Sequence, residues 1–216
     1  MNVKLLQEGA RSLGVELSGQ AVGRLEQYMG ELLRWNRSIN LTAITQSDEI
    51  IAKHFVDSMS IVPLLRPHEH LLDVGSGAGL PGLVVAMLRD DLPITSVDAV
   101  DKKVRFQRHI CRLLTLDQVE AIHQRVERLA EQRPGQFDLV SSRAFRDPLR
   151  FMQLAHPLVR PGGRLVAMVA NTGGIEEWNM EQCACDHGFR LLEMRSYELP
   201  RQLGARKLVV FGRNPL

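Results

Sequence analysis

The residues best suited to chemistry lie in the stretch LLDVGSGAGLPG at positions 71–82. An apolar run carries an acid near its end, and Gly75, Gly77 and Gly79 follow at every second position. Glycine adopts positive φ readily and lets a ligand approach the backbone, while Pro81 suits the first turn of a helix, where its missing N–H costs nothing. The pattern predicts a ligand-binding loop between a buried strand and a helix.

Two carboxylates accompany this loop. Asp98 ends a second apolar run at 94–98 (ITSVD), in position to accept hydrogen bonds from both hydroxyls of a ribose. Asp73 lies one residue before the first strand ends, which suits a cation such as the amino or sulfonium group of S-adenosylmethionine better than a pyrophosphate. The loop and the two acids together predict an adenosine-bearing cofactor.

The same glycines are also compatible with a dinucleotide cofactor. Gly77, Gly79 and Gly82 match the dinucleotide fingerprint G-x-G-x-x-G, which would indicate a nicotinamide-dependent dehydrogenase. The register disfavours it, because the strand ends directly before Gly75 and the sixth position counted from that glycine is Leu80 rather than glycine or alanine. A methyl donor is therefore favoured, and a glycine-rich turn without a ligand is the remaining alternative.

The elements that must position these residues follow from a change in hydrophobic period. Up to about residue 66 the apolar residues recur at helical spacing, with Ser18 as an N-cap and with Pro63 and Pro67 closing the last helix. From residue 70 onward short apolar runs alternate with helix-length segments, which is typical of a parallel sheet with helices on both faces. Seven strands are predicted, the last two an antiparallel pair: 71–74, 94–98, 118–123, 137–141, 163–170, 189–197 and 206–212.

The predicted architecture is thus an α/β protein with a seven-stranded sheet. Residues 1–66 form an N-terminal helical cap, and residues 67–216 form the cofactor-binding domain, packed with the cap as one unit. The 216 residues, of which 44% are hydrophobic and 24% charged, suffice for a full core. A net charge of +2 is too small to identify a nucleic-acid partner.

The cysteines and the hydropathy pattern exclude several other classes. Cys111, Cys183 and Cys185 are an odd number without metal-ligand spacing, so we expect neither a disulfide framework nor a metal site. No apolar run approaches the roughly 18 residues that a membrane span needs. We expect a cytoplasmic protein.

Several separated segments resemble the bacterial small-subunit ribosomal RNA guanine-N7 methyltransferase G family, also called glucose-inhibited division protein B. They are RWNRSINLT (34–42), KHFVDS (53–58), DVGSGAGLPG (73–82), VDAVDKKVRF (97–106), RVE (125–127), SRAF (142–145) and RKLVVF (206–211). The segments occur in the family's order over nearly the whole chain. The Leu-Pro-Gly ending of the glycine loop, together with W-N-x-x-x-N-L-T and H-x-x-D-S upstream, makes the resemblance specific.

The resemblance implies a class I, Rossmann-like methyltransferase fold with S-adenosylmethionine as methyl donor. The implied acceptor is N7 of one guanine in the decoding region of 16S rRNA, within the small ribosomal subunit or an assembly intermediate. Carried over position by position, it implies cofactor contacts at Gly75, Leu80, Val126, Glu127 and Arg143. The residue arguments add Asp73, Gly77 and Asp98 to this set.

Two positions depart from the family's pattern. The fifth predicted strand ends in Val169-Ala170, where the family commonly has Lys-Gly, so this chain has no lysine at that position. Near the end of the chain Arg206-Lys207 stands where the family commonly has Arg-His, which keeps a basic residue.

The chemistry of the implied acceptor limits the catalytic residues to look for. Guanine N7 carries an exposed lone pair and needs no deprotonation, so no catalytic acid or base is assigned. The main requirement is alignment of N7, methyl carbon and sulfur. The alternatives are a methyltransferase of the same fold acting on another RNA or substrate, and a non-catalytic ribosome-binding module.

RNA contacts require basic groups, and segments shared with the family supply them. The predicted RNA-contacting residues are Lys53, His54, Arg206 and Lys207. His54, Asp57 and Ser58 share a helix face, and we expect them to fix the cap to the sheet rather than form a catalytic triad. Trp35 is similarly expected to pack the cap rather than stack on a base.

Overall fold

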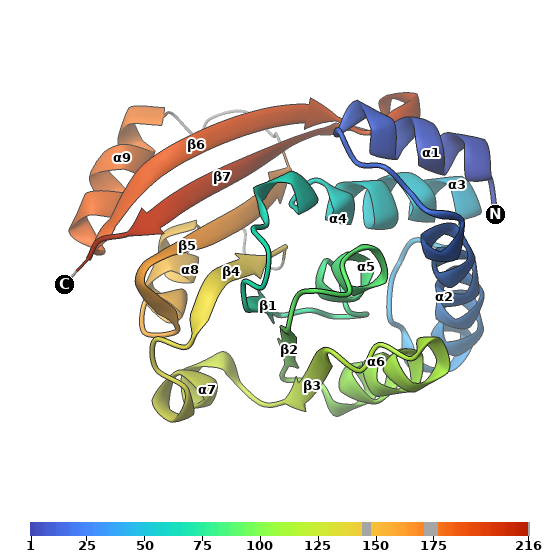
Figure 1. Ribbon diagram of the computed structural model, residues 1–216, viewed down its shortest axis with the longest axis horizontal. Coiled ribbons are helices and arrows are strands. Elements are labelled where there is room, and N and C mark those ends of the chain that lie inside the picture. Colours follow the sequence, from blue (N-terminus) through green and yellow to red (C-terminus); the bar gives the residue numbers. More distant parts are fainter. Residues whose placement is uncertain (144–147, 171–176, 216) are drawn as a thin grey trace.

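The computed structural model describes residues 1–143, 148–170 and 177–215. Within these ranges seven strands form one sheet: β1 (Leu71–Val74), β2 (Ile94–Asp98), β3 (Val119–His123), β4 (Phe137–Ser142), β5 (Val159–Ala170), β6 (Phe189–Glu198) and β7 (Ala205–Arg213). Their spatial order is β3-β2-β1-β4-β5-β7-β6 (Figure 1). The first five are mutually parallel, and β7 is antiparallel to both β5 and β6. The predicted seven-stranded α/β sheet with a terminal antiparallel pair is confirmed.

Helices precede the sheet and connect its strands. The N-terminal ones are α1 (Val3–Ser12), α2 (Gly19–Ile39), α3 (Ser47–Ile50), the π-helical segment η1 (Ile51–Val56), α4 (Asp57–Met59) and the 3₁₀ turn η2 (Val62–Leu64). Those that follow are α5 (Gly82–Leu88), α6 (Asp101–Leu114), α7 (Val126–Gln132), α8 (Pro148–Ala155), α9 (Glu177–Asp186) and the 3₁₀ turn η3 (Pro200–Gln202). The turn η3 lies in the short connection from β6 to β7, where a hairpin loop is predicted.

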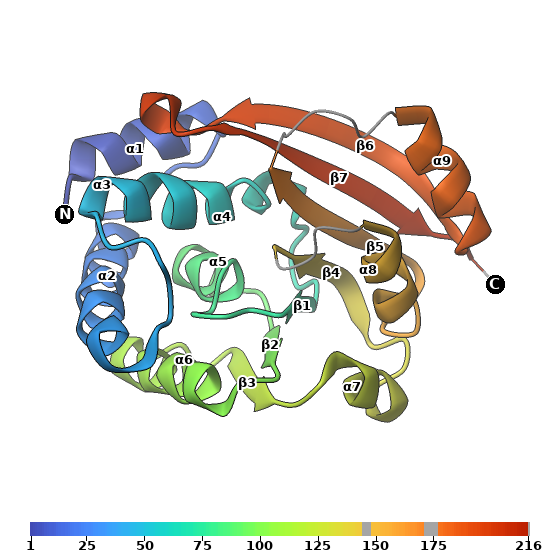
Figure 2. The same cartoon turned by 180° about the vertical axis from the view of Figure 1, so that it is seen from behind.

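The helices cover both faces of the sheet, as Figures 1 and 2 show: α5, α6 and the N-terminal helices on one, α7, α8 and α9 on the other. Successive residues along a strand point to opposite faces. Leu71 accordingly belongs to the core shared with the N-terminal helices, whereas Leu72 belongs to the core under α8 and α9. The central strands β1, β2 and β4 are therefore buried on both sides, which explains why they read as mostly apolar runs rather than as alternating ones.

Local capping signals set the ends of α2. Ser18 is its N-cap, since the Ser18 hydroxyl accepts a hydrogen bond from Ala21 N at 3.1 Å, as predicted. The helix ends at Asn40, which adopts the left-handed conformation with φ 42°. The Asn36 side chain then accepts from Leu41 N at 2.6 Å and from Thr42 N at 2.9 Å, which turns the chain out of the helix.

The helix predicted after Ser47 is present but contains an irregularity. It runs through α3 and α4 with the π-helical turn η1 between them. π-Helical turns are rare and are found frequently at functional sites. Nothing in the hydrophobic period of this segment signals the π turn.

One predicted strand boundary is wrong by four residues, whereas the bounds of the other strands agree within one residue. Strand β5 begins at Val159 rather than at Gly163, because pairing with β4 already starts where Phe137 lies opposite Val159. The register then shifts, so that Leu139 pairs with Arg164. The extra residues of β5 include Pro161 and Gly162, which read as a loop in the sequence although the strand continues through them.

The parallel strands place the functional loops together. The carboxyl ends of β1, β2 and β4 lie at the same edge of the sheet, so the segments after Val74, Asp98 and Ser142 are neighbours. This edge is where open α/β sheets bind their ligands. In the described part of the chain, no helix combines the length and apolar character needed to cross a membrane.

Candidate active site

The glycine loop connects β1 to α5 in a compact turn. Gly75, Gly77 and Gly79 all have positive φ, at 66°, 60° and 97°. The amides of Gly79 and Leu80 both donate to the carbonyl of Ser76, at 2.8 Å each. The predicted loop, with glycine where the backbone turns left-handed, is therefore present.

Asp98 at the end of β2 is held in a defined orientation beside this loop. Its Oδ2 accepts a hydrogen bond from Gly77 N at 2.8 Å, and its Oδ1 accepts one from Val100 N at 2.9 Å. The residue is only 7% exposed. Each carboxylate oxygen keeps a lone pair for a further donor, so Asp98 can still bind hydroxyl groups of a ligand.

A cavity of about 120 Å³ lies against Asp98. It is lined by Val74, Gly75, Val97, Asp98, Ala99, Gln124, Arg125, Val126 and Glu127. Four residues predicted to contact a cofactor thus come together from β1, β2 and the start of α7. The cavity is smaller than the roughly 300–1,000 Å³ of typical small-molecule pockets, so a cofactor-sized ligand would extend beyond it.

Asp73 lies beneath the loop and is fully buried. Its Oδ2 accepts a hydrogen bond from Gly82 N at 2.8 Å, whereas Oδ1 makes no hydrogen bond within the described residues. Burial raises the pKa of this carboxyl to about 7, against the opposing effects of the Gly82 N–H and of the positive charge of Arg143. Asp73 does not line the cavity beside Asp98, so its contact with a cationic ligand group stays a prediction.

Arg143, directly after β4, points toward the N-terminal helices. It donates to the carbonyl of Lys53 at 2.9 Å, to Ser58 Oγ at 3.0 Å and to the carbonyl of His54 at 3.3 Å, and it pairs with Asp57 at 3.3 Å. It does not line the cavity beside Asp98. Its proposed cofactor contact stays a prediction, and Ala144 and Phe145 of the SRAF segment lie outside the described residues.

Leu80 and Gly77 are also absent from the cavity lining. Leu80 is 8% exposed and packs in the core shared with the N-terminal helices. Gly77 contributes its amide to Asp98 instead. Cofactor contacts at these two positions stay predictions.

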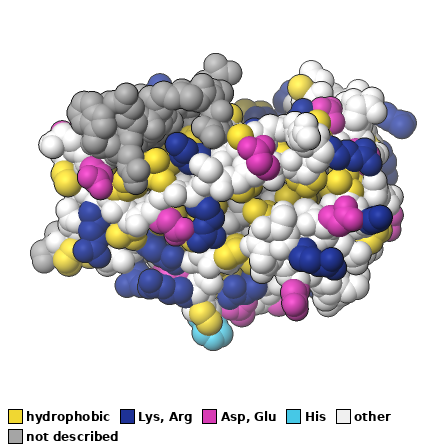
Figure 3. All heavy atoms as spheres, turned by 90° about the horizontal axis from the view of Figure 1, so that it is seen from above, with side chains coloured by type: hydrophobic (Ala, Val, Ile, Leu, Met, Phe, Trp, Pro, Cys, Tyr) yellow, Lys and Arg dark blue, Asp and Glu magenta, His cyan; other side chains and the backbone are white. Residues whose placement is uncertain are grey.

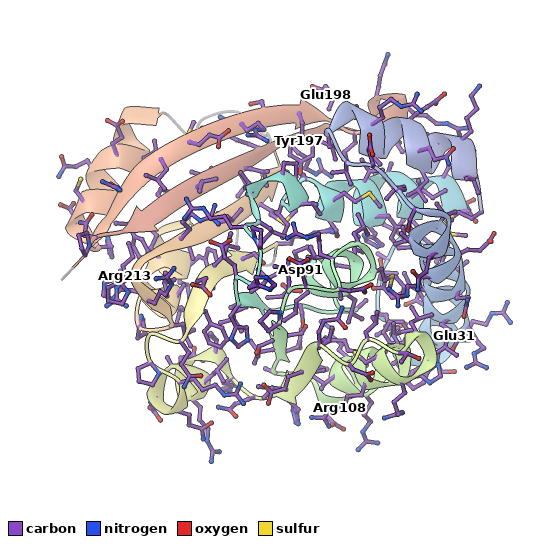
Figure 4. The ribbon with its side chains drawn as sticks, in the orientation of Figure 1. Glu31, Asp91, Arg108, Tyr197, Glu198 and Arg213 are labelled. Carbon is purple, nitrogen blue, oxygen red and sulfur yellow. The ribbon has the colours of Figure 1, made fainter. Side chains whose placement is uncertain are left out.

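Asp57 joins the cap to three strands, as expected for this helix face. Besides the pairing with Arg143, its Oδ1 accepts a hydrogen bond from Tyr197 Oη at 2.6 Å and lies 3.7 Å from Arg206 Nε. Figure 4 marks Tyr197 at the end of β6 nearest to α1. The His54 ring instead contacts another cap residue, with Nε2 2.8 Å from Thr42 Oγ1, so Asp57 and Ser58 anchor the cap while His54 does not, and the three side chains form no catalytic triad.

Comparison with known proteins now decides the family. The family described as rRNA small subunit methyltransferase G matches residues 22–203 of the chain. The chain belongs to this family.

Relatives and solved structures agree with that assignment. "Ribosomal RNA small subunit methyltransferase G" of Geobacter metallireducens is 45% identical over 97% of this chain and 95% of its own length. The protein of the same name from Geotalea uraniireducens is 43% identical over 96% of this chain and 94% of its own length.

Among solved structures, an Aquifex aeolicus protein described as a SAM dependent methyltransferase superposes with a TM-score of 0.58 at 15% identity, covering 80% of this chain and 96% of that one. The M. jannaschii TYW2 structure in complex with AdoMet gives 0.60 at 14% identity, covering 79% and 77%. At these identities the structures show the shared fold alone.

The RNA-contacting residues predicted for this methyltransferase G family member occupy different environments. Lys53 Nζ pairs with Glu49 at 2.5 Å. His54 is buried, and burial lowers its pKa to about 4, with the nearby Arg143 charge acting in the same direction. His54 is therefore neutral at pH 7, and its contact with RNA stays a prediction.

Arg206 and Lys207 lie on opposite faces of the sheet. They are adjacent in β7, so their side chains leave opposite faces of the sheet. Arg206 shares the face of Leu208 and lies near Asp57, whereas Lys207 shares the face of Val209 in the other core. RNA contacts at these two positions stay predictions.

Among the described residues, the surface seen from above carries charges of both signs (Figure 3). Figure 3 shows Lys and Arg side chains interspersed with Asp and Glu on this face. Arg195 pairs with Glu193 at 2.7 Å, and Arg201 pairs with Asp48. In the described part of the chain, no group of three or more His, Cys, Asp and Glu side chains is arranged to hold a metal ion.

Two residues that touch the glycine loop are missing from the sequence-based set. Tyr28 donates its hydroxyl to the carbonyl of Ala78 at 2.8 Å, and Gln107 donates to the carbonyl of Gly77 at 2.8 Å. In the sequence Tyr28 lies within the apolar stripe of α2, and Gln107 lies in a helix rich in basic residues. Neither pattern distinguishes them from ordinary helix residues.

Proposed function

We propose that this chain transfers the methyl group of S-adenosylmethionine to N7 of a guanine in the decoding region of 16S rRNA. The observation that carries the proposal is the cavity in which Asp98 meets the glycine loop, in a member of the methyltransferase G family. The family assignment supports a ribosomal RNA acceptor. The N7 atom and the decoding region are proposed from the resemblance of the sequence motifs to those of the family.

The residues around the loop fit the proposed cofactor. Asp98 has both carboxylate oxygens oriented by backbone amides, and each keeps a lone pair that can accept from a ribose hydroxyl. Asp73 supplies a buried oxygen without a partner in the described residues, which suits the cationic end of the donor. Gly75, Val126 and Glu127 would line the remaining surface of the site.

Methyl transfer to N7 needs no catalytic acid or base from this chain, because N7 attacks through a lone pair without being deprotonated. S-adenosylmethionine, when bound, supplies the electrophilic methyl group. The protein's residues must orient the donor, exclude water and hold the guanine edge in line, effects worth up to about 7–11 kcal/mol when the geometry is fully fixed. Arg143 would contribute by holding the end of β4 against the cap, and neutral His54 would contribute by fixing Thr42.

Small ribosomal subunits from cells that lack the enzyme provide the test of acceptor and atom. They are incubated with the protein and methyl-labelled S-adenosylmethionine, and 16S rRNA is then mapped by chemical cleavage at N7-methylguanine. We expect label at one guanine of the decoding region. Label in another RNA or at another atom would contradict the proposed acceptor.

Matched variants connect that activity to the described site. Asp98→Ala removes the oriented carboxylate and should weaken donor binding by about 1–3 kcal/mol. Asp117→Ala, at an exposed acid in the turn after α6, is the control and should leave donor binding unchanged. Equal donor affinity for both variants in calorimetry would place the donor somewhere other than beside Asp98.

A further inference from the structure

Two side chains from outside the β1–α5 unit hold the backbone of the glycine loop. Tyr28 from α2 donates to the carbonyl of Ala78 at 2.8 Å. Gln107 from α6 donates through Nε2 to the carbonyl of Gly77 and to Ser76 Oγ, at 2.8 Å each. Three successive loop residues are thus bound by helices that approach from different directions.

The Tyr28 hydroxyl has little freedom to move. Its ring is fully buried and stacks between Phe55 of η1, with ring centroids 5.5 Å apart, and Phe106 of α6, with centroids 6.0 Å apart. Burial raises the pKa of Tyr28, so the hydroxyl stays protonated and remains a donor. Packing against two other elements therefore fixes the point from which the hydroxyl binds Ala78.

Gln107 and Asp98 both form hydrogen bonds with the backbone of Gly77. The Gly77 amide donates to Asp98 Oδ2, and the Gly77 carbonyl accepts from Gln107. Gln107 is fully buried, and its Oε1 makes no hydrogen bond within the described residues. A buried amide with one unpaired oxygen lowers the stability of the fold. In Gln107 such an amide lies where its other end orients the glycine loop.

We infer that Tyr28 and Gln107 are positioning residues that preorganise the glycine loop for the donor, which makes helix α2 of the cap part of the donor site. The inference rests on the proposed function, because it takes the loop as the place where S-adenosylmethionine binds. A loop already held in its bound conformation loses less conformational entropy when the ligand binds. Release of either anchor should weaken the donor complex, while chemistry in the saturated enzyme continues.

Calorimetry of the full chain with S-adenosylmethionine and S-adenosylhomocysteine tests the effect on binding. Tyr28→Phe keeps the ring stack and removes one hydrogen bond, and Gln107→Met keeps the volume and removes two. We expect the Kd to rise about three- to tenfold for Tyr28→Phe and somewhat more for Gln107→Met. In methylation assays KM for the donor should rise similarly, with kcat at saturating donor close to the unmodified protein.

The same substitution at Gln118 is the control that distinguishes loss of support for the loop from general loss of packing. The amide of Gln118 donates to the carbonyl of Ala86 in α5 at 3.0 Å, away from the loop. Gln118→Met should therefore leave Kd unchanged even where it lowers the thermal unfolding temperature. An equal rise in Kd for Gln107→Met and Gln118→Met would overturn the inference.

Amide hydrogen exchange, measured without the donor, tests directly whether Tyr28 and Gln107 stabilise the glycine loop. The amides of Gly79 and Leu80 are bound to Ser76 within the loop, and they should exchange faster in Tyr28→Phe and Gln107→Met than in the unmodified protein or in Gln118→Met. Unchanged exchange would overturn the inference whether or not the donor binds. Failure of the unmodified protein to bind the donor would instead contradict the proposed function, and the exchange result would still decide the role of the two anchors.

Discussion

Asp73 is a carboxyl of the candidate site whose ionisation can change near neutral pH. It is fully buried under the glycine loop, and its pKa of about 7 is set chiefly by burial. The unfolded chain has an ordinary Asp pKa of about 3.9. Folding therefore favours the protonated carboxyl, whereas a cationic ligand favours the ionised one.

These opposite preferences predict two pH dependences. Between about pH 4 and pH 7 the folded state binds more protons than the unfolded state, so the free energy of unfolding should fall as the pH rises through this range. Donor affinity should rise over the same range, by at most about tenfold per pH unit, since binding then no longer has to remove a proton from Asp73. Chemical denaturation and calorimetry between pH 5.5 and 7.5 measure both effects.

Asp73→Asn is the control for this prediction. The amide is uncharged at every pH, so the variant should show a flatter pH profile both for unfolding and for donor binding. Its donor affinity should be close to that of the protonated wild-type site. A donor affinity that depends equally on pH in both proteins would assign the titration to another group.

At the scale of elements, the junction between α4 and the strands depends on Asp57. This carboxylate is 5% exposed, and it faces Arg143, Tyr197 and Arg206, which come from the end of β4, from β6 and from β7. Its removal leaves two partly buried guanidinium groups without their shared counter-charge. The loss affects three strand ends at once.

We predict that Asp57→Ala lowers the free energy of unfolding by about 3–5 kcal/mol, the usual effect of breaking a buried ion pair from one side. Chemical denaturation measures it. Asp48→Ala removes the more exposed pairing with Arg201 and should cost no more than about 1 kcal/mol. A similar small loss for Asp57→Ala would mean that the junction is held by packing alone.

The elements themselves were largely predictable, whereas such junctions were not. Strands β1 and β2 match their predicted bounds because hydrophobic runs and glycine signals are local. The bond between Asp57 and Tyr197 joins residues 140 positions apart, and no local pattern encodes it. The same limit applies to His54: its place in a segment shared with the family predicts an RNA contact, but the sequence does not reveal that the side chain is buried.

The candidate site shows the same division between local and distant information. Asp98 and the positive-φ glycines were found from spacing, since one strand and its loop suffice to place them. Tyr28 was not, because its importance lies in a hydroxyl that reaches Ala78 from 50 residues away. Arg143 was found by resemblance, but its four contacts with the segment from Lys53 to Ser58 could not be derived from either sequence segment alone.

At the scale of the whole molecule, the cap and the sheet share one core. Leu25, Phe55 and Met59 of the N-terminal helices pack in the same cluster as Leu83 and Val84 of α5 and Phe106 of α6. The aromatic stack through Tyr28 continues this core from α2 to α6. We therefore propose that residues 1–66 and 67–216 fold as one cooperative unit.

This proposal predicts that residues 67–216 expressed alone do not reach a stable native state. Without the cap, Leu83, Val84 and Phe106, all fully buried in the whole chain, would face water together with their neighbours. Each such side chain contributes about 1.5–3 kcal/mol on burial, so exposure of five or more removes as much as the 5–15 kcal/mol that stabilises a typical domain. Circular dichroism and thermal unfolding of the fragment measure this, and addition of a separate peptide covering residues 1–66 should restore a cooperative transition. A fragment that unfolds cooperatively by itself and binds S-adenosylmethionine as tightly as the whole chain would show that the cap is an independent addition, and it would also remove α2 from the donor site.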